Sequence, residues 1–385
     1  MAEPFLVVSD VHLSHEGAAA TAGALAELVQ RHPGREIIFA GDIFGLSSDP
    51  PKRDPVESAH SLLRAYPSLT GALRAHLASG AALSFLAGNH DAALSDARAR
   101  PALLSALDLT PQSRLAIKPW FIRRGRVHVE HGHIWDPDNA PAHPLATWSP
   151  STEPLGISLT RHFVARRKVW QFAHAHETTL LKGLQRAFQL FGAGAPLLVA
   201  QYFSTSGAIC AATLFDRGLS AEREQGARSL PRVSEEAGVS QQALQTLLEA
   251  APSPTHTEFQ RTFLRLYFDR VFAVLGLASG AACALGGALP LGALLAAASG
   301  GYLGFNVKRS GARYSNQPIR LLRDGSEVVR KLTEAELVVF GHTHVPVSER
   351  GYANAGSFGY PEVGSGRPYL VVDEAGGAEL RRFER

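Results

Sequence analysis

Short apolar runs that each end in a cluster of Asp, Asn or His constrain the fold of this chain more than any other feature. Five such runs occupy residues 5–9, 36–40, 83–87, 127–130 and 337–340. Their length and their β-branched content predict buried strands. Ala- and Leu-rich stretches with helical spacing lie between the first of them, over 18–31 and 58–77. Strands and helices in alternation are typical of βαβ crossovers, so the sequence predicts an α/β fold.

The strand pattern stops at about residue 141 and resumes after residue 331. Long helical or apolar stretches fill 141–331, which we interpret as a helical insertion. Residues 1–140 and 332–385 are then the two parts of one catalytic domain. Near the C-terminus, short apolar runs alternate with Gly-rich turns and predict antiparallel strands. These runs lie at 352–355, 369–373 and 379–383.

The polar clusters all follow predicted strands, where ligand sites of open α/β sheets lie. In chain order they are Asp10-Val11-His12, Gly41-Asp42, Gly88-Asn89-His90-Asp91, His131-Gly132-His133 and Gly341-His342-Thr343-His344. Carboxylate, imidazole and amide ligands suit Mn, Fe or Zn better than Ca. Cys210 and Cys283 lie in apolar surroundings, so no thiolate site for structural zinc is expected. A shared Asp with several His residues permits two adjacent divalent transition-metal ions.

The series DxH, GD, GNHD, HGH and GHTH resembles the calcineurin-like metallophosphoesterase superfamily, over about residues 4–135 and 335–385. The resemblance implies a four-layer α/β/β/α sandwich and hydrolysis of a phosphoester at two metal ions. It also implies seven metal ligands, grouped as one set for each ion and one bridge: Asp10, His12 and His344; Asn89, His131 and His342; and Asp42.

Further site residues are expected beside these ligands. The resemblance places His90 over the phosphate as the general acid, held by Asp91; the alternative is that His90 only orients Asn89. We expect His133, Asp136 and Asn139 to contact the substrate. The alternative for His133 is that it orients a metal ligand and does not touch the substrate. The alternative for residues 136–139 is that their side chains only stabilise the turn around Pro137.

The substrate class is the least constrained part of the prediction. The chain is distantly similar to the UDP-2,3-diacylglucosamine pyrophosphatases in its DxH, GD, HGx and GHTH blocks. That family typically carries Arg where this chain has His90. A soluble phosphodiesterase or phosphatase with a helical lid, a nuclease and a metal-bound scaffold are the alternatives. A scaffold predicts loss of a ligand, whereas all seven are present.

Residues 234–248 read like a helix-turn-helix with Gly238 at the turn. No Lys or Arg occurs between Arg232 and Arg261, although a DNA-reading unit needs basic residues for phosphates. The net charge of +3 is also small for a protein that binds nucleic acid. We therefore expect a pair of cap helices and no nucleic-acid partner. The sequence leaves the oligomeric state open.

Residues 271–307 contain no charged side chain and are interrupted by Pro290 and Gly292. Such a stretch predicts two helices joined as a hairpin that enters a membrane lipid bilayer. Arg and Lys residues flank it on both sides, which predicts that both ends face the cytoplasm, at the inner face of the cell membrane. A basic helix over 161–186 would lie on anionic lipid. The alternatives are a span within the uncharged stretch 187–215 and a cytoplasmic protein with a buried helical cap.

Overall fold

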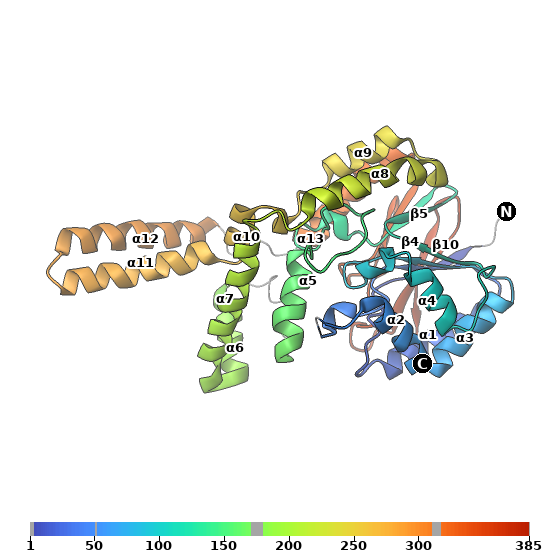
Figure 1. Cartoon of the computed structure of the whole chain (residues 1–385), viewed down its shortest axis with the longest axis horizontal. Coiled ribbons are helices and arrows are strands. Elements are labelled where there is room, and N and C mark those ends of the chain that lie inside the picture. The colour runs from blue at the N-terminus through green and yellow to red at the C-terminus, as the bar shows by residue number, and fades with distance from the viewer. Residues whose placement is uncertain (1–3, 51, 171–179, 310–316, 385) are drawn as a thin grey trace. The chain divides into compact units, whose positions relative to one another are not determined.

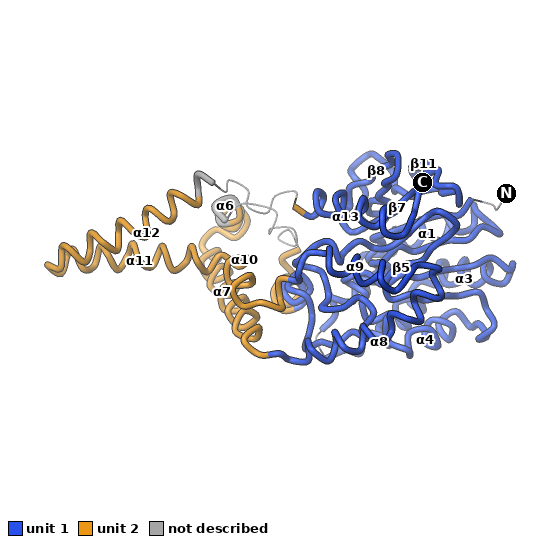
Figure 2. The backbone as a smooth tube through the Cα atoms, turned by 90° about the horizontal axis from the view of Figure 1, so that it is seen from above, with its two compact units in different colours: residues 1–161, 216–254, 318–385 blue, residues 162–215, 255–317 orange. Residues whose placement is uncertain are grey.

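The computed structural model describes residues 4–50, 52–170, 180–309 and 317–384, which form two compact units. Figure 2 colours them separately. Unit 1 comprises Met1–Arg161, Asp216–Pro254 and Pro318–Arg385, and unit 2 comprises His162–Phe215 and Thr255–Gln317. All the strands that the structure describes belong to unit 1.

Unit 1 contains two β-sheets. The first has six strands in the order β11-β10-β1-β2-β3-β4. Their bounds are β1 Phe5–Val8, β2 Ile37–Ala40, β3 Leu83–Leu86, β4 Leu115–Lys118, β10 Arg367–Val372 and β11 Ala378–Phe383. Strands β1 to β4 are parallel, whereas β10 and β11 are antiparallel to their neighbours.

The second sheet has five strands in the order β5-β6-β7-β9-β8. Their bounds are β5 Phe121–Arg124, β6 Val127–Glu130, β7 Leu337–Phe340, β8 Val347–Glu349 and β9 Tyr352–Asn354. The three central strands are parallel, and the edge strands β5 and β8 are antiparallel. Strands β6 and β7 are separated in the chain by residues 131–336. Their pairing brings the N-terminal and C-terminal parts of unit 1 into one sheet.

The alternation of side chains along each strand builds the layers of unit 1. Leu6 and Val8 of β1 pack against four helices, whereas Val7 packs between the sheets. These helices are α1 Ala19–Arg31, α2 Pro55–Ala65, α3 Pro67–Ala78 and α4 Ala99–Ala106. Val339 of β7 also lies between the sheets, whereas Phe340 packs against α8 Leu219–Ala237, α9 Gln241–Ala250 and α13 Gln317–Thr333. The order of layers is helices, sheet, sheet, helices (Figure 1), and the predicted α/β class is confirmed.

Several predicted elements differ in detail. The helix predicted over 58–77 is two helices, because Pro67 begins α3 and disfavours helical backbone at Tyr66. The predicted antiparallel strands are confirmed for β10 and β11, whereas 352–355 forms β9, which pairs antiparallel with β8 but parallel with β7. Strand β9 lies in the second sheet, parallel to β7, where Ala353 is fully buried. Strands β4, β5 and β8 were not predicted.

The region 141–331 is divided between the two units. Leu230 of α8, Leu244 of α9 and Leu322 of α13 share a buried cluster with Phe340, so these helices belong to unit 1. Helix α8 ends at Gly238, whose φ of 63° suits a glycine, and Ser240 caps α9 by accepting a hydrogen bond from Ala243 N. The helix pair predicted there therefore packs on the second sheet with its apolar face.

Unit 2 is helical in its described residues. Its helices are α6 Leu180–Phe191, α7 Ala195–Ala212, α10 Phe259–Arg265, α11 Phe268–Leu285 and α12 Leu289–Arg309. Helices α11 and α12 form the predicted hairpin (Figure 1). A Cβ at Gly280 would lie 2.9 Å from Gly292 O, so glycine permits the close approach of the two backbones. Among the described helices, only α11 is long and apolar enough to span a membrane by length and composition.

Candidate metal centre

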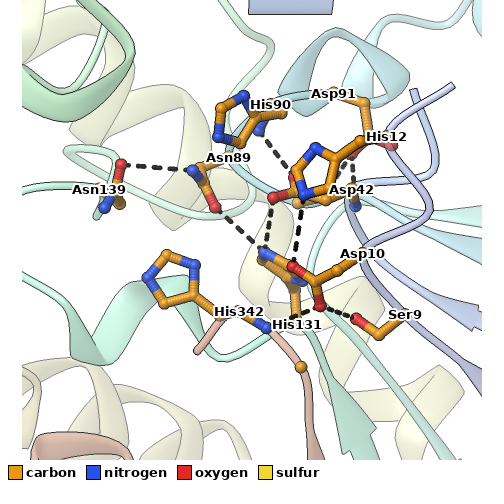
Figure 3. A network of polar contacts seen from close by, with 12 residues as sticks. Ser9, Asp10, His12, Asp42, Asn89, His90, Asp91, His131, Asn139 and His342 are labelled. Carbon is orange, nitrogen blue, oxygen red and sulfur yellow. Dashed lines mark hydrogen bonds and ion pairs between the residues drawn. The ribbon is translucent and has the colours of Figure 1, made fainter. Parts of the chain in front are cut away.

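The five polar clusters converge at one edge of the two sheets, beyond the carboxyl ends of β1, β2, β3, β6 and β7. The chain turns sharply directly after these strands. Five residues of the clusters have left-handed backbone, with φ between 52° and 69°: Asp10, His12, Asp42, His342 and His344. Non-glycine residues rarely adopt this conformation, and it recurs where a functional site constrains the backbone. The sharp turns direct the side chains of separate loops toward one volume (Figure 3).

Two glycines make room for the converging side chains. Gly41 has a φ of 84°, and a Cβ at this position would lie 2.5 Å from the His131 ring. A Cβ at Gly88 would lie 2.2 Å from Asp42 Oδ1. Any larger residue at either position must displace a predicted ligand. Lack of space for a side chain therefore explains why the GD and GNHD clusters each begin with glycine.

Asp10, His12 and His344 form the first group of possible ligands, with ligand atoms within 4.8 Å of one another. His344 Nε2 lies 3.1 Å from Asp10 Oδ1, and His12 Nε2 lies 3.7 Å from the same oxygen. Asp10 is fully buried, and its Oδ1 accepts no hydrogen bond among the described residues. Its other oxygen accepts hydrogen bonds from Ser9 Oγ at 2.5 Å and from His342 N at 2.9 Å. One carboxylate oxygen is therefore held by the protein, and the other is directed at the two imidazoles.

Asp42, His131 and His342 form the second group, also within 4.8 Å. His131 Nε2 lies 3.1 Å from Asp42 Oδ2 and 3.0 Å from Asn89 Oδ1. The other ring nitrogen of His131 lies 2.8 Å from Ala40 O, so Nδ1 carries the proton and Nε2 offers its lone pair when the ring is neutral. Asp42 Oδ1 accepts a hydrogen bond from His90 N at 2.8 Å. The first group contains the same residues as the set that the resemblance implied for one ion. The second group joins Asp42, the implied bridge, to His131 and His342 of the other set, and Asn89 lies beside it, in contact with His131.

The electrostatics of these groups fit bound cations. Burial opposes ionisation of Asp10, yet the nearby charges of His344 and His131 hold the pKa of Asp10 well below its usual range. The pKa of Asp42 is likewise lowered against burial, chiefly by His131. Burial disfavours a charged His131, but Asp42 and Asp10 raise the pKa of His131 to about 10. Two buried carboxylates thus demand positive charge in this volume, which divalent ions supply more fully than protonated imidazoles.

Residues 3–191 match the model of the calcineurin-like phosphoesterase family. This match identifies residues 3–191 as a calcineurin-like phosphoesterase domain. This family consists of metal-dependent phosphoric ester hydrolases. The match covers the first four clusters of the phosphoesterase, whereas His342 and His344 lie beyond it and are joined to them by the pairing of β6 with β7. No curated protein matches the chain.

In this phosphoesterase His90 lies beside the centre, with its ring centroid 5.0 Å from that of His12. A ring nitrogen of His90 lies within 4.8 Å of ligand atoms of His12 and Asp42. His90 Nδ1 is hydrogen bonded to Ser47 Oγ. Burial, only partly opposed by the charge of Asp42, lowers the pKa of His90 to about 3.

The expectation that Asp91 holds His90 is wrong. Asp91 is fully buried and accepts backbone hydrogen bonds at 2.7–3.2 Å; the donors are Asp42 N, Ile43 N, Phe44 N and Gly88 N. Both carboxylate oxygens are thereby occupied, and the Asp91 side chain ties the loop after β2 to the loop after β3. Burial and the charge of Asp42 raise the pKa of Asp91 to about 7, against the donors, which favour the ionised form.

The three residues predicted to contact substrate occupy different positions. His133 is buried, its Nδ1 has no hydrogen-bond partner among the described residues, and it lines a cavity with Asn89 and Asn139. The cavity also has apolar walls that include Trp148. Asp136, by contrast, is buried against His342, with Oδ2 2.9 Å from His342 Nε2. Asn139 accepts a hydrogen bond from Asn89 Nδ2 at 3.3 Å. The structure thus brings two of the three into contact with predicted ligands.

Sequence reasoning missed Ser9, Ser47 and Tyr360. Tyr360 is exposed, and its ring lies 5.4 Å from the His12 ring and 6.2 Å from the His344 ring. Ser9 could have been suspected from its position before Asp10, but no sequence signal marks the other two. The segment after GHTH supports the loop that carries the first ligand, because Ser357 Oγ donates to Asp10 O at 2.9 Å.

Proposed function

We propose that this phosphoesterase hydrolyses its substrate with two divalent transition-metal ions, Mn, Fe or Zn. Asp10, His12 and His344 would hold one ion, and Asn89, His131 and His342 would hold the other, with Asp42 between them. The observation that carries this proposal is the convergence of two buried carboxylates and five other ligand side chains from five loops. When bound, such ions polarise phosphoryl oxygens and lower the pKa of water, so that hydroxide is available at neutral pH.

The protein side chains have three further tasks in this proposal. Asp10 Oδ1 would be available to the first ion, and the Asp42 carboxylate, which lies beside His131, would be available to both ions. His90 donates a proton to the departing alkoxide, and Ser47 fixes its ring. Burial lowers the pKa of His90 in the free protein, and a bound anionic phosphoester would favour its protonated form. His133 contacts the substrate from the cavity wall.

A substrate panel tests this proposal. The purified protein is assayed with Mn²⁺ on a phosphodiester, a phosphomonoester and a pyrophosphate, before and after chelation. We expect hydrolysis of at least one class, abolished by the chelator and restored by Mn²⁺. A metal-bound scaffold without activity would leave all three substrates intact in the presence of bound metal.

We also propose that unit 2 binds a membrane and that the substrate is lipid-linked or membrane-proximal. The α11–α12 hairpin exposes large apolar side chains along its length. The exposed fractions are 60% for Phe272, 91% for Leu285, 66% for Leu294 and 58% for Phe305. Of α11, only Ala273 and Gly280 are buried. A continuous apolar surface of this kind is rare in a soluble protein and is typical of a segment solvated by lipid.

The position of charges supports the same proposal. Arg261 and Arg265 precede the hairpin and Arg270 lies in the first turn of α11, as expected when both ends of a hairpin stay on the cytoplasmic side. Arg313, on the other flank, lies outside the described residues. Since the ligands on both sides of the insertion meet in one centre, the chain must cross the membrane an even number of times, which a hairpin satisfies.

Fractionation tests membrane binding separately from catalysis. We expect the full-length protein to stay with membranes through salt and carbonate washes, and a variant lacking residues 271–307 to become soluble while it retains metal-dependent hydrolysis of a small aryl phosphoester. Release of the full-length protein by salt or carbonate alone would contradict the proposal and favour a soluble phosphoesterase with a helical lid. The similarity to UDP-2,3-diacylglucosamine pyrophosphatases stays a prediction, which hydrolysis of such a nucleotide-linked lipid would test.

A further inference from the structure

We propose that Asp136 and Asn139 are positioning residues that fix two ligands of the same ion, His342 and Asn89. This inference rests on the proposed two-ion function and adds residues to it. Both lie in the loop that follows β6, which contributes His131 to the same ion.

Asp136 determines which nitrogen of His342 is available. Asp136 Oδ2 lies 2.9 Å from His342 Nε2, and Asp136 is only 4% exposed. A carboxylate accepts a hydrogen bond, so Nε2 carries the proton and Nδ1 presents its lone pair. A neutral imidazole with its second nitrogen bound to a carboxylate is the usual arrangement of a metal-binding histidine. Asp136 thus sets both the tautomer and the orientation of the His342 ring.

Asn139 determines which atom of Asn89 faces the centre. Asn89 Nδ2 donates to Asn139 Oδ1 at 3.3 Å, and Asn89 Oδ1 lies 3.0 Å from His131 Nε2 (Figure 3). Only the amide oxygen can ligate a divalent cation, whereas the NH₂ group would repel it. The hydrogen bond to Asn139 therefore keeps the oxygen of Asn89 directed at the ion position.

The two positioning residues are themselves joined. Asn139 Nδ2 donates to Asp136 Oδ2 at 2.7 Å, so the oxygen that holds His342 also holds Asn139. Asn139 N and Ala140 N donate to Asp136 O at 2.9 and 2.8 Å, which fixes the loop as a turn. One chain of hydrogen bonds therefore runs from His342 through Asp136 and Asn139 to Asn89.

Gly156, in helix α5 Leu155–Leu159, accommodates this chain. A Cβ at Gly156 would lie 2.3 Å from Asn139 Oδ1, the atom that accepts from Asn89. Gly156→Ala therefore displaces Asn139 without removing any polar group of the network. The first ion position has other supports, since Ser9 Oγ and His342 N orient Asp10. Loss of the network should therefore lower the affinity for the ion held by Asn89, His131 and His342 more than the affinity for the ion held by Asp10.

Manganese titration tests the proposal. Metal-free wild-type protein and the variants Asp136→Ala, Asn139→Ala and Gly156→Ala are titrated with Mn²⁺, with bound metal measured by equilibrium dialysis and the paired ions by the exchange-coupled signal of Mn(II) in electron paramagnetic resonance. We expect each variant to keep one ion at wild-type affinity, to bind the second about 10–100-fold more weakly, and to lose the coupled signal at low Mn²⁺. Turnover should recover as Mn²⁺ is raised.

The control is Asp138→Asn, which changes a carboxylate of the same loop. It should keep two ions at wild-type affinity, and thermal melting should show that all variants are folded. Two ions bound at wild-type affinity in all three folded variants, or equal weakening in the control, would overturn the proposal. Failure of the wild-type protein to bind any Mn²⁺ would instead overturn the proposed function.

Discussion

His12 and His344 are 332 positions apart in the chain, and their Nε2 atoms lie 3.3 Å apart. Two imidazole lone pairs at this distance repel each other unless a proton or a cation lies between them. The contact exists because β1 and β7, in different sheets, end at the same edge of unit 1. The predictions below concern the groups that build this edge.

His90 is expected to act on poor leaving groups. Replacement by Gln should lower turnover about 10²–10⁴-fold on an alkyl phosphoester, because the departing alkoxide then lacks a proton donor. An activated nitrophenyl ester needs less protonation and should lose much less. Ser47→Ala should also lower turnover more on the alkyl ester than on the nitrophenyl ester, but by a smaller factor. It removes only the hydrogen bond that fixes the His90 ring. Equal losses on both esters with unchanged metal content would contradict the general-acid role.

Asp91 is expected to stabilise the fold of the centre and not to hold His90. Asp91→Asn replaces an acceptor oxygen by an NH₂ group that faces backbone donors, which should lower the free energy of unfolding by about 2–3 kcal/mol. The matched change Glu336→Gln, in an exposed pair with Arg126, should cost less than about 1 kcal/mol. Urea unfolding of both variants measures the difference. Similar values for the two would show that the four backbone hydrogen bonds of Asp91 contribute little.

Gly41 and Gly34 separate backbone strain from steric conflict. Both have positive φ, 84° and 79°, but a Cβ at Gly34 meets nothing within 4 Å whereas one at Gly41 meets the His131 ring. Gly34→Ala should cost about 1 kcal/mol of strain and leave metal binding intact. Gly41→Ala should displace His131 and reduce metal content as well. The account predicts different metal content in the two variants, and equal metal content would contradict it.

His143 is expected to make stability depend on pH. It is buried beside α8, and burial lowers the pKa of His143 to about 4. The folded state therefore keeps His143 neutral while the unfolded state binds a proton below its ordinary pKa of about 6.5. Stability from this residue is complete above pH 6.5 and is lost progressively down to about pH 4, by about 2–3 kcal/mol after allowance for partial solvation. Unfolding curves of wild type and His143→Asn should converge as the pH falls, and parallel curves would refute the assignment.

The sequence predicted the strands that carry the site because their residues are mostly β-branched or otherwise apolar, as suits strands that are buried on both faces. Strands β1, β2, β3, β6 and β7 were all located within a residue or two. Strands β4, β5 and β8 were missed, since β4 and β5 end in half-buried basic residues and β8 is short and largely exposed. A half-exposed edge strand has little pattern to distinguish it from a loop.

The partners of the site residues could not be predicted in the same way. Ser47 and His90 are 43 positions apart, and Asp136 and His342 are 206 apart. Such pairs depend on left-handed turns and on the register between β6 and β7, which local propensity does not determine. The expectation that Asp91 holds His90 relied on adjacency in the chain, but the backbone after β3 directs the two side chains to different neighbours.

The most direct test of the two-ion account is a manganese titration of the metal-free wild-type protein with activity as the readout. We expect hydrolysis of an aryl phosphoester to be absent without metal, to rise with added Mn²⁺ and to reach its plateau at two bound ions per chain. Replacement of a residue that only orients a metal ligand typically costs about 10–100-fold in activity. Asp42→Asn should cost more than this, because it weakens the binding of both ions. If elemental analysis finds no bound metal and Mn²⁺ restores no hydrolysis, the central claim is contradicted.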